Sequence, residues 1–387
     1  MRRLLRITAA EYAGIVRNPA VLLIFIAGLA IYALLYPLPY SGELLRNVPV
    51  VPVDLDNTSL SRKLIRWTDA TEEVGLLSPS PSLEHARGRL MAGDAGGVLV
   101  VPEGFERAVL RGEDAVVSAY ADATWFLVYR QALSGIYKAA ATLSAGVEIR
   151  RHTAAGLGEK HALDARDPLP VVVRPLFNPA GGYATYIVPA VLMLILQQTL
   201  LIGIGTVGGA RNETFLTVTG AAPAGHESAL AVLVGRALAY FSLYILYPVF
   251  YLAVVYRVYG LPSPGNPLMA VAFTAPFVLS VTLLGMAMGM LFHSRDDAVP
   301  ALIYTSVPAV FLMGFAWPLE AVPAWLRAPA MLIPCVPGAV GFVRINQMGA
   351  TLREVLDLWM LLWAQCALYG LLAWFGVQYR PGPGQAP

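Results

Sequence analysis

A run of 22 uncharged residues, Tyr183 to Ile204, constrains this chain more than any other feature. With a rise of about 1.5 Å per residue, a helix of this length crosses a hydrocarbon core about 30 Å thick. The run therefore predicts a membrane-spanning helix. Just past its middle it carries three polar residues in succession, Gln197, Gln198 and Thr199. Side-chain amides at that depth need partners, so at least one is expected to face other helices or a watery path rather than lipid.

Five further apolar segments have the length of a membrane span, namely 20–37, 230–256, 268–292, 299–317 and 355–376. Only 13% of the residues are charged, whereas about a quarter are charged in soluble proteins. The chain is therefore predicted to be an α-helical integral membrane protein with six transmembrane helices. A cleaved signal peptide is the competing interpretation of the first segment. That segment exceeds the usual apolar length of about 7 to 15 residues, and no A-x-A site follows it.

One polar region interrupts the apolar segments. Residues 41–176 hold 32 of the chain's 52 charged residues, which is typical of a water-exposed folded domain. Three short β-rich runs occur there, at 48–56, 96–102 and 115–122. Each is followed by a helical stretch, at 59–70, 104–111 and 124–155. The sequence thus predicts an α/β extracytoplasmic domain inserted between helices 1 and 2.

Polar residues gather at two strand-to-helix junctions of this domain. They are Asp56-Asn57-Thr58-Ser59 and Asp122-Ala123-Thr124. One interpretation is a ligand or metal site. The other is capping of the following helices, which these residue types do well at such junctions, and we favour it.

Charge distribution predicts the orientation of the chain. Residues 1–19 hold four arginines beside an apolar helical face, which is typical of an interfacial helix on the cytoplasmic surface. With the N-terminus inside, eight arginines fall on short cytoplasmic segments and four on short outer ones. The tail 377–387 and the polar stretch 205–227 are then cytoplasmic. The external segment 317–353 contains five prolines in residues 317–349, so short re-entrant or interfacial helices are expected there.

Several motifs of enzymes are missing. None of the three lysines, Lys63, Lys138 and Lys160, is followed by Ser or Thr, so the chain has no phosphate-binding P-loop. HExxH and GxSxG are also absent, and Cys335 and Cys366 lack the spacing of a metal or redox pair. We therefore expect no catalytic site, no metal and no cofactor in this chain. The net charge of +2 gives no support to binding of nucleic acid.

Two further stretches carry alternative interpretations. Tyr240, Tyr244, Tyr247 and Tyr251 recur at helical spacing, so they either line a path for a hydrophobic substrate or pack between helices. The stretch 205–227 is either a solvated linker between membrane helices or a docking element for a cytoplasmic partner.

The order of several segments makes this chain similar to a known family. They are RNP at 17–19, VPVVPVDLDNTSLS, GGVLVVPEGFERAVLRG, YADAT, FNPAGGYATYIVPAVL at 177–192, RNET, and FAWPLEAVPAWL at 315–326. Together they resemble the membrane subunit of ABC-2 type exporters, the drug and lipid efflux permeases that have a large external domain after their first helix. The likeness covers nearly the whole chain.

The resemblance implies partners and a function. Such permeases form dimers, homomeric or heteromeric, and pair with two copies of a separate ATPase that binds the ATP and Mg. They lie in the bacterial cytoplasmic membrane and export hydrophobic or amphiphilic compounds. The ATPase docks on the N-terminal helix and on the loop after the second span. The docking candidates here are therefore Arg6, Glu11, Arg211, Asn212, Glu213 and Thr214. Family members often carry a Glu-rich run at that loop, and this chain departs from it.

The substrate seam of such an exporter is expected at the second and third spans. Its candidate residues are Gln197, Gln198, Thr199, Tyr240, Tyr244 and Tyr247. The main alternative is a membrane-anchored receptor or assembly factor that acts through its external domain. That alternative predicts a function that survives removal of helices three to six, which a transporter does not tolerate.

Overall fold

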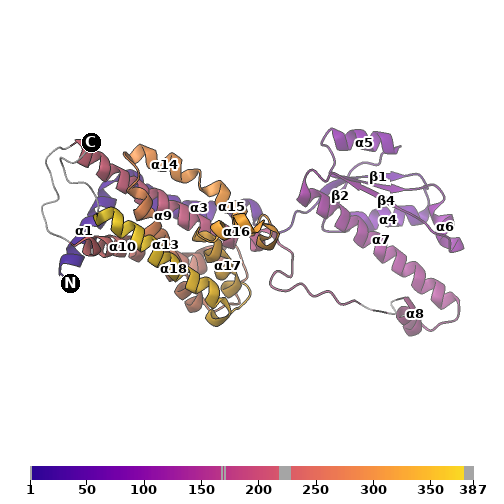
Figure 1. Ribbon diagram of the computed structural model, residues 1–387. Coiled ribbons are helices and arrows are strands. Elements are labelled where there is room, and N and C mark those ends of the chain that lie inside the picture. Colours follow the sequence, from indigo (N-terminus) through magenta and orange to yellow (C-terminus); the bar gives the residue numbers. More distant parts are fainter. Residues whose placement is uncertain (1, 167–168, 170, 218–227, 379–387) are drawn as a thin grey trace. The chain divides into compact units, whose positions relative to one another are not determined.

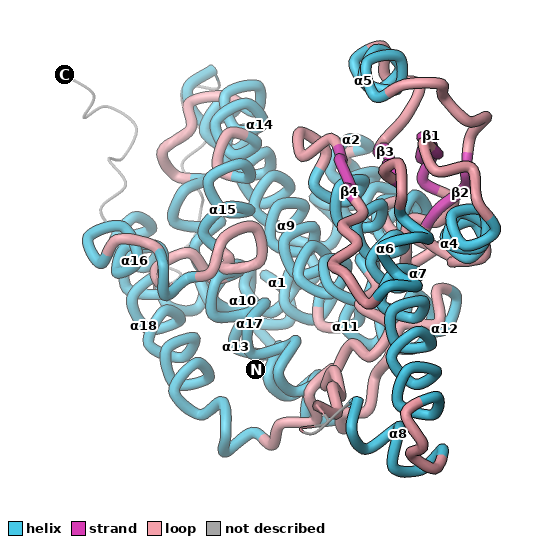
Figure 2. The backbone as a smooth tube through the Cα atoms, turned by 90° about the vertical axis from the view of Figure 1, so that its right-hand side faces the viewer, coloured by secondary structure: helices cyan, strands magenta, loops and turns pink. Residues whose placement is uncertain are grey.

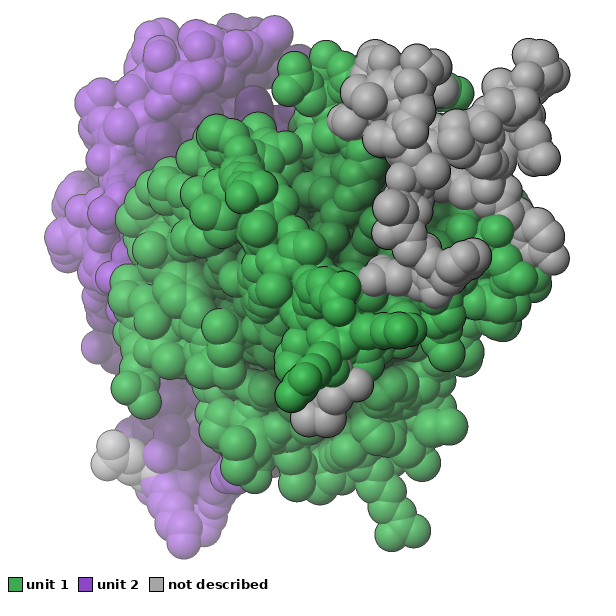
Figure 3. Space-filling view, turned by 90° about the vertical axis from the view of Figure 1, so that its left-hand side faces the viewer, with its two compact units in different colours: residues 1–43, 175–387 green, residues 44–174 purple. Residues whose placement is uncertain are grey.

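The computed structural model describes residues 2–166, 169, 171–217 and 228–378 (Figure 1). The chain forms two compact units, shown in different colours in Figure 3. The helical unit comprises residues 1–43 and 175–387, and the α/β unit comprises residues 44–174. The α/β unit falls within the segment 41–176 that the charge density singled out.

The helical unit begins with α1 (Arg2–Arg17) and a first long helical run from Pro19 to Tyr40. That run consists of α2 (Pro19–Leu22), a π-helical turn (Leu23–Gly28), α3 (Leu29–Leu35) and a 3-10 turn (Leu38–Tyr40). After the α/β unit come α9 (Tyr183–Thr217), α10 (Ala229–Tyr244), α11 (Leu246–Phe250), a π-helical turn (Tyr251–Val255), α12 (Tyr256–Val258) and α13 (Pro267–Gly289). The remaining helices are α14 (Arg295–Ile303), α15 (Ser306–Leu312), a 3-10 turn (Leu319–Ala321), α16 (Ala324–Ala330), α17 (Cys335–Asn346), a 3-10 turn (Leu352–Val355) and α18 (Leu356–Gln378).

Five helical runs of the described chain are long and apolar enough to cross a membrane, and they are Pro19–Tyr40, Tyr183–Glu213, Ala229–Val258, Pro267–Gly289 and Leu352–Gln378. A sixth arises only if α16 and α17, which meet at an angle of 81°, count as one broken span. The prediction of an integral membrane protein built of helices is therefore confirmed, with five to six spans.

The predicted span at 299–317 is wrong as a single helix. The structure divides this segment into α14 and α15, with a break at Tyr304 and Thr305. Pro308 lies one turn beyond the break. It has no N–H to donate to the carbonyl of Tyr304, so the helical hydrogen bonding is interrupted at that point.

The predicted loop at 205–227 is also partly wrong, because α9 continues without interruption to Thr217. At 35 residues, α9 is about 52 Å long, which exceeds the thickness of a hydrocarbon core. Its polar last turns hold the RNET segment, in which Arg211 and Asn212 contact other helices of the unit. Residues 218–227, the rest of the predicted loop, lie outside the described residues.

Helices α9 and α13 form the centre of the helical unit (Figure 1). The most apolar part of α9 is 78% buried and that of α13 is 61% buried, whereas the first and last spans are each 28% buried. Glycines allow this close packing. A Cβ atom on Gly208 of α9 would lie 2.6 Å from the carbonyl oxygen of Gly289 of α13. Gly285 and Gly289 of α13, which are four residues apart, face Ile204 and Gly208 of α9.

The α/β unit contains a four-stranded sheet in the order β2-β1-β3-β4. Its strands are β1 (Val48–Asp54), β2 (Val74–Leu76), β3 (Gly97–Val101) and β4 (Ser118–Ala121). β1 pairs in parallel with β2 and β3, while β4 is antiparallel to β3. The helices of this unit are α4 (Ser59–Asp69), α5 (Leu83–Met91), α6 (Phe105–Arg111), α7 (Phe126–Ala154) and α8 (Glu159–Arg166).

Apolar residues cover both faces of this sheet. Helix α7 covers one face of the sheet and α5 the other (Figure 2). Leu99 packs with Ala132 and Ile136 of α7, and Val98 packs with Ala86 of α5. A strand buried on both faces reads as a continuous run of β-branched residues, which explains the sequence VPVVPV. The three predicted strands and the helices after them are present. β2, α5 and α8 were not predicted, and β2 is only three residues long.

Candidate functional site

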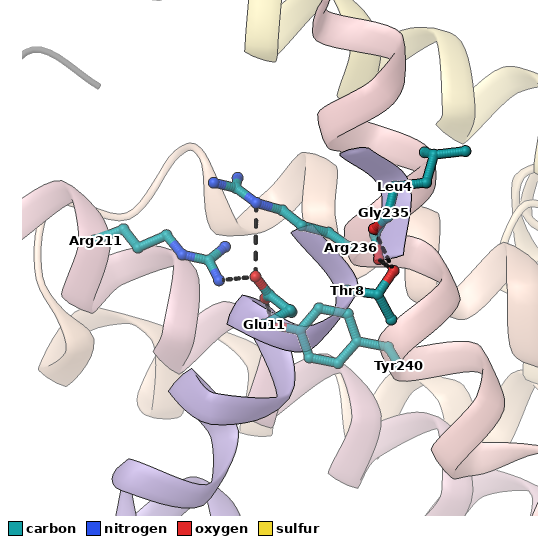
Figure 4. A network of polar contacts seen from close by, with 7 residues as sticks. All are labelled: Leu4, Thr8, Glu11, Arg211, Gly235, Arg236 and Tyr240. Atoms are coloured by element: carbon teal, nitrogen blue, oxygen red, sulfur yellow. Dashed lines mark hydrogen bonds and ion pairs between the residues drawn. The ribbon is translucent and has the colours of Figure 1, made fainter. Parts of the chain in front are cut away.

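A buried carboxylate connects three helices at the end of α9 that holds the RNET segment. Glu11 of α1 is only 4% exposed. It accepts hydrogen bonds from the guanidinium of Arg211 of α9 and from the hydroxyl of Tyr240 of α10 (Figure 4). The Nε atom of Arg236, also on α10, lies 3.6 Å from the same carboxylate. We call these four residues the Glu11 network.

The sequence of α1 explains how Glu11 reaches this position. Thr8, Glu11 and Ile15 recur every three to four residues, so they form one buried face. The hydroxyl of Thr8 donates to the carbonyl of Gly235 at 2.9 Å. Gly235 also permits the close approach of α1, because a Cβ atom there would lie 2.8 Å from Ile7. The N-terminal helix is therefore packed on α10 along its length.

The Glu11 network contains one carboxylate and two guanidinium groups. A carboxylate withdrawn from water is expensive unless it is paired, and two guanidinium groups surround this one. The side chains of Arg211 and Arg236 are 30% and 26% exposed, so each keeps partial contact with solvent. The network thus pairs one buried carboxylate with two partly exposed guanidinium groups.

The neighbouring Asn212 connects α9 to α13. Its amide nitrogen donates to the carbonyl of Phe292 at 2.6 Å and approaches that of Gly289 at 3.3 Å. These carbonyls lie at the end of α13, where no further turn of helix exists to bind them. The RNET segment therefore holds both α1 and α13 to the end of α9.

The structure brings some of the docking candidates together and separates others. Glu11 and Arg211 bind each other, and Asn212 binds the end of α13. Arg6 and Glu213 are exposed on α1 and α9, and the side chain of Thr214 lies outside the described residues. Arg236 was not predicted. It is the only charged residue between 230 and 256, and a charge in an apolar segment is itself a signal of a buried partner.

The three polar residues at the middle of α9 all have partners inside the helical unit. The Gln197 side-chain oxygen accepts a hydrogen bond from the backbone N–H of Cys335 at 2.7 Å. Gln198 lies 3.3 Å from the hydroxyl of Thr305, and the hydroxyl of Thr199 binds a carbonyl of its own helix. Gln197 and Gln198 are 2% and 9% exposed, so they face other helices. This is one of the two surroundings that the sequence predicted, the other being a watery path.

Gln197 belongs to a set of side chains that bind the break between α16 and α17. Gln365 donates to the carbonyl of Met331 at 2.7 Å, and Tyr369 donates to that of Leu332. Gln347, just after α17, donates to the carbonyl of Thr185 at 2.6 Å. Non-helical backbone at membrane depth is tolerated only where its polar groups find partners inside the protein. Gln197, Gln365 and Tyr369 supply the partners at the break, and Gln347 binds the end of α17 to α9, so the bent pair α16–α17 is held by α9 and α18.

The tyrosine face of the third span packs against the first span. Phe25 contacts Tyr240 and Tyr244 with ring centroids 5.9 and 5.0 Å apart. The hydroxyl of Tyr247 donates to the carbonyl of Phe25. The N–H of Leu29, which would bind that carbonyl in an α-helix, binds those of Ile24 and Ile26 instead. Tyr247 therefore stabilises the π-helical turn of the first span.

In this structure these tyrosines thus pack between helices, which is the second of the two interpretations that the sequence allowed. Tyr240 is also a member of the Glu11 network, so the same face reaches from the first span to the buried carboxylate.

The first polar junction of the α/β unit, at Asp56 to Ser59, caps two helices. The carboxylate of Asp56 accepts from the hydroxyl of Thr58 at 2.6 Å and from the N–H of Glu106, in the first turn of α6, at 3.0 Å. Thr58 caps α4. Partial desolvation acts to raise the pKa of Asp56, but these hydrogen bonds outweigh it and lower that pKa below its ordinary value.

Asp122 binds the N–H of Thr124 at 2.9 Å, just before α7. Capping, the favoured interpretation of both junctions, therefore agrees with the contacts of Asp56 and Thr58. Asp122 instead closes a turn before α7, whose N-cap residue Trp125 has no side-chain hydrogen bond. Among the residues that the structure describes, no group of three or more His, Cys, Asp or Glu side chains is placed to hold a metal ion.

A comparison with protein families decides what kind of protein this is. A family described as ABC-2 family transporter protein matches residues 19–375. The chain belongs to the ABC-2 transporter family. Its match includes both the helical and the α/β unit, so the resemblance noted in the sequence is confirmed. Among curated proteins no match is found.

Membership defines the general role of the chain. ABC-2 proteins are membrane components of transport systems that lack the nucleotide-binding domain. This chain is therefore the multi-pass permease subunit of an ABC transporter, and its partner is an ABC ATPase. The absence of a P-loop from its sequence agrees with that division of labour.

Proposed function

We propose that this ABC-2 permease is the transmembrane subunit of an exporter for hydrophobic or amphiphilic compounds, either drug-like molecules or lipids. Two permease protomers and two ATPase subunits form the transporter. The ATPase binds ATP and Mg, and the permease itself binds no cofactor. The complex lies in the cytoplasmic membrane of a bacterium, with both permease termini inside. It moves its substrate out of the cytoplasm or the inner leaflet.

The observation that carries this proposal is the Glu11 network. It binds α1 and α10 to the last turns of α9, and the docking candidates Arg6 and Glu213 are exposed on the same two elements as Glu11 and Arg211. An ATPase that docks on α1 and the end of α9 would therefore pull on a helix that runs through the centre of the unit. Because a paired buried charge resists separation, the network would transmit that movement rather than absorb it.

The substrate seam of this exporter is proposed at α9 and the third span. Its residues are packed in the present conformation, so substrate passage requires the helices to separate. Gln198 is the candidate closest to such an opening, because its partner Thr305 lies in the break between α14 and α15 rather than in a continuous helix. Separation of α15 from α9 would expose both side chains to a passing polar group.

The test is reconstitution of the permease with its ATPase in proteoliposomes. ATP-dependent movement of a fluorescent amphiphile out of the inner leaflet is the expected result. The Glu11→Gln variant should still bind the ATPase and support ATP hydrolysis, while transport falls at least about tenfold. Loss of the carboxylate removes the charge that both arginines approach, although the partial exposure of the arginines reduces the cost in stability.

Ser242→Ala is the matched control. It removes the hydrogen bond of 2.6 Å between Ser242 and Tyr12, which belongs to the same α1–α10 contact but carries no charge. Transport by this variant should stay within about twofold of wild type. Normal transport by Glu11→Gln would refute the role of the network. Failure of the wild-type permease to bind an ATPase or to move any amphiphile would refute the proposed function.

A further inference from the structure

A continuous row of aromatic rings lies at the start of α9, at the end of that helix opposite the Glu11 network. Neighbouring ring centroids in the row are 5.2 to 6.4 Å apart. We call it the aromatic row, and its members in order of contact are Tyr32, Tyr36, Tyr40, Tyr183, Tyr186 and Phe315. The row starts on α3, crosses to the first turn of α9 and ends just beyond α15. Neither the resemblance nor the motif analysis drew attention to it.

The rings of the aromatic row are partly exposed. Tyr32 is 53% exposed and Tyr186 is 46% exposed, and the four rings other than these two are half-buried. Tyrosines at a membrane boundary commonly anchor single helices at the level of the lipid headgroups. Here, however, the rings contact one another across three separate segments. They therefore offer a connected aromatic surface rather than isolated anchors.

A carboxylate lies in the middle of the row. The N–H of Glu43 donates to the carbonyl of Tyr40 at 2.8 Å, and the N–H of Tyr183 donates to the carbonyl of Glu43 at 2.8 Å. The Glu43 carboxylate accepts from the N–H and the hydroxyl of Thr185, at 3.1 and 2.7 Å. These contacts hold the charge at the first turn of α9. They also hold Glu43 at a φ of 59°, in the left-handed region that non-glycine residues rarely adopt.

No cation balances this charge within the part of the chain that the structure describes. Neither Lys, Arg nor His approaches the Glu43 carboxylate within 4.0 Å, whereas Glu11 at the other end of α9 has two arginines. Glu43 is half-buried, so part of it remains accessible. The start of α9 thus combines aromatic faces with a carboxylate that no cationic side chain of the described residues pairs.

We infer that the aromatic row and Glu43 form a binding site for an organic cation, an amphiphile that carries an ammonium or phosphonium group. The electron-rich faces of aromatic rings attract such cations, and the attraction is stronger where the ring is shielded from water. A nearby carboxylate adds a longer-range attraction that an anion or a neutral compound of the same shape does not gain. The place of this site in export rests on the proposed function, whereas the binding itself does not.

The first test needs no variant. The full-length permease is placed in nanodiscs without ATPase or ATP, and binding of tetraphenylphosphonium is measured by equilibrium dialysis against empty nanodiscs. Tetraphenylborate, which has nearly the same shape and the opposite charge, is measured in parallel. The permease should bind the cation at least about tenfold more tightly than the anion. Equal binding of the two ions by the permease would overturn the inference.

Variants then locate the site. Glu43→Gln keeps an oxygen that accepts from Thr185 but removes the charge, and it should weaken cation binding about tenfold. Tyr186→Leu should weaken it about two- to fivefold, because one exposed ring is lost. Asp357→Asn, which removes an exposed charge at the start of α18, is the matched control and should bind as wild type. Melting temperatures show whether each variant is folded.

Unchanged cation affinity in folded Tyr186→Leu and Glu43→Gln would place the cation elsewhere and refute the site. If Glu43→Gln is unfolded, unchanged affinity in Tyr186→Leu alone refutes it. The proposed function fails in a different way. There the permease binds tetraphenylphosphonium with the predicted selectivity, but the complete transporter moves no amphiphile. Conversely, normal export of a neutral amphiphile by Glu43→Gln, together with lost cation binding, supports both proposals.

Discussion

Individual polar side chains hold the helical unit together at points where a bilayer offers no water. Gln197, Gln347 and Gln365 each bind a backbone group that lies outside regular helix or at a helix end. Each of those backbone groups would otherwise be buried without a partner, which costs about 1 to 3 kcal/mol. Gln197, which the sequence suggested for a substrate path, thus also stabilises the packing of the helices in this conformation.

The two adjacent glutamines of α9 should therefore differ in their effect on stability. Gln197→Leu leaves the N–H of Cys335 buried and unpaired, so it should lower the stability of the purified permease by about 1 to 3 kcal/mol. Gln198→Leu should cost less, because Thr305 retains its bond to the carbonyl of Leu302 at 2.6 Å. Thermal unfolding of both variants in detergent measures the difference. A larger loss in Gln198→Leu would contradict this assignment.

Asp56 gives the α/β unit a defined dependence on pH. Its pKa in the folded state is lower than its ordinary value of 3.8. Its contribution to stability is therefore fully present above pH 3.8 and is lost as the pH falls through the lower, folded-state value. The Asp56→Asn variant should be less stable than wild type at pH 6, and the difference should shrink below pH 3.8. Urea unfolding of both proteins across this pH range measures the difference in stability. A difference between Asp56→Asn and wild type that grows below pH 3.8 would contradict this prediction.

Among the elements, α9 makes the closest contacts because its glycines expose backbone to its neighbours. Gly208 lies against the backbone of Gly289, and Gly209 lies against that of Ser294. Backbone does not move aside as the end of a side chain does, so an added methyl group there forces the helices apart. The break of the predicted fifth span into α14 and α15 belongs to the same region. The short α14 packs directly on this glycine-rich part of α9.

Two Gly→Ala substitutions should show this contrast. Gly208→Ala places a Cβ atom 2.6 Å from the Gly289 carbonyl oxygen, so it should destabilise the permease by about 1 to 3 kcal/mol. Gly14→Ala in α1 meets no atom within 4 Å and should stabilise by about 0.5 to 1 kcal/mol, because alanine favours helix over glycine. Thermal unfolding measures both. Equal effects would show that the contact between α9 and α13 is looser than described.

The whole molecule consists of two units with separate cores. Three clusters of buried apolar residues lie within the α/β unit, around both faces of its sheet, and none of their members belongs to the helical unit. A domain with a core of its own can fold by itself. The chain enters and leaves this unit at residues 44 and 174, which delimit a fragment for expression.

The isolated fragment 44–174 should therefore be soluble and fold cooperatively. We expect a mixed helix and strand circular dichroism spectrum and a single unfolding transition in urea. Val98→Ala, which opens a hole between the sheet and α5, should lower the stability of the fragment by about 1 to 3 kcal/mol. A fragment that lacks cooperative unfolding would show that this unit depends on the rest of the chain.

Much of the architecture was predictable because it follows from local patterns. Apolar length identified five of the six proposed spans, and charge density together with alternating β-rich and helical runs identified the α/β unit. The missing P-loop excluded ATP binding of that kind, and the order of segments pointed to the ABC-2 family. Each of these properties is carried by residues close together in the chain, so no knowledge of tertiary contacts is needed to see it.

Tertiary structure alone decided which residues are partners. Glu11 and Arg211 are 200 positions apart, and Gln197 and Cys335 are 138 apart, so no periodicity relates them. The bend between α16 and α17 depends on such distant contacts. So does the meeting of Glu43 with the aromatic row. The reason is physical, because local sequence sets the length and polarity of a helix, whereas packing selects which buried charge or amide can be satisfied and by which neighbour.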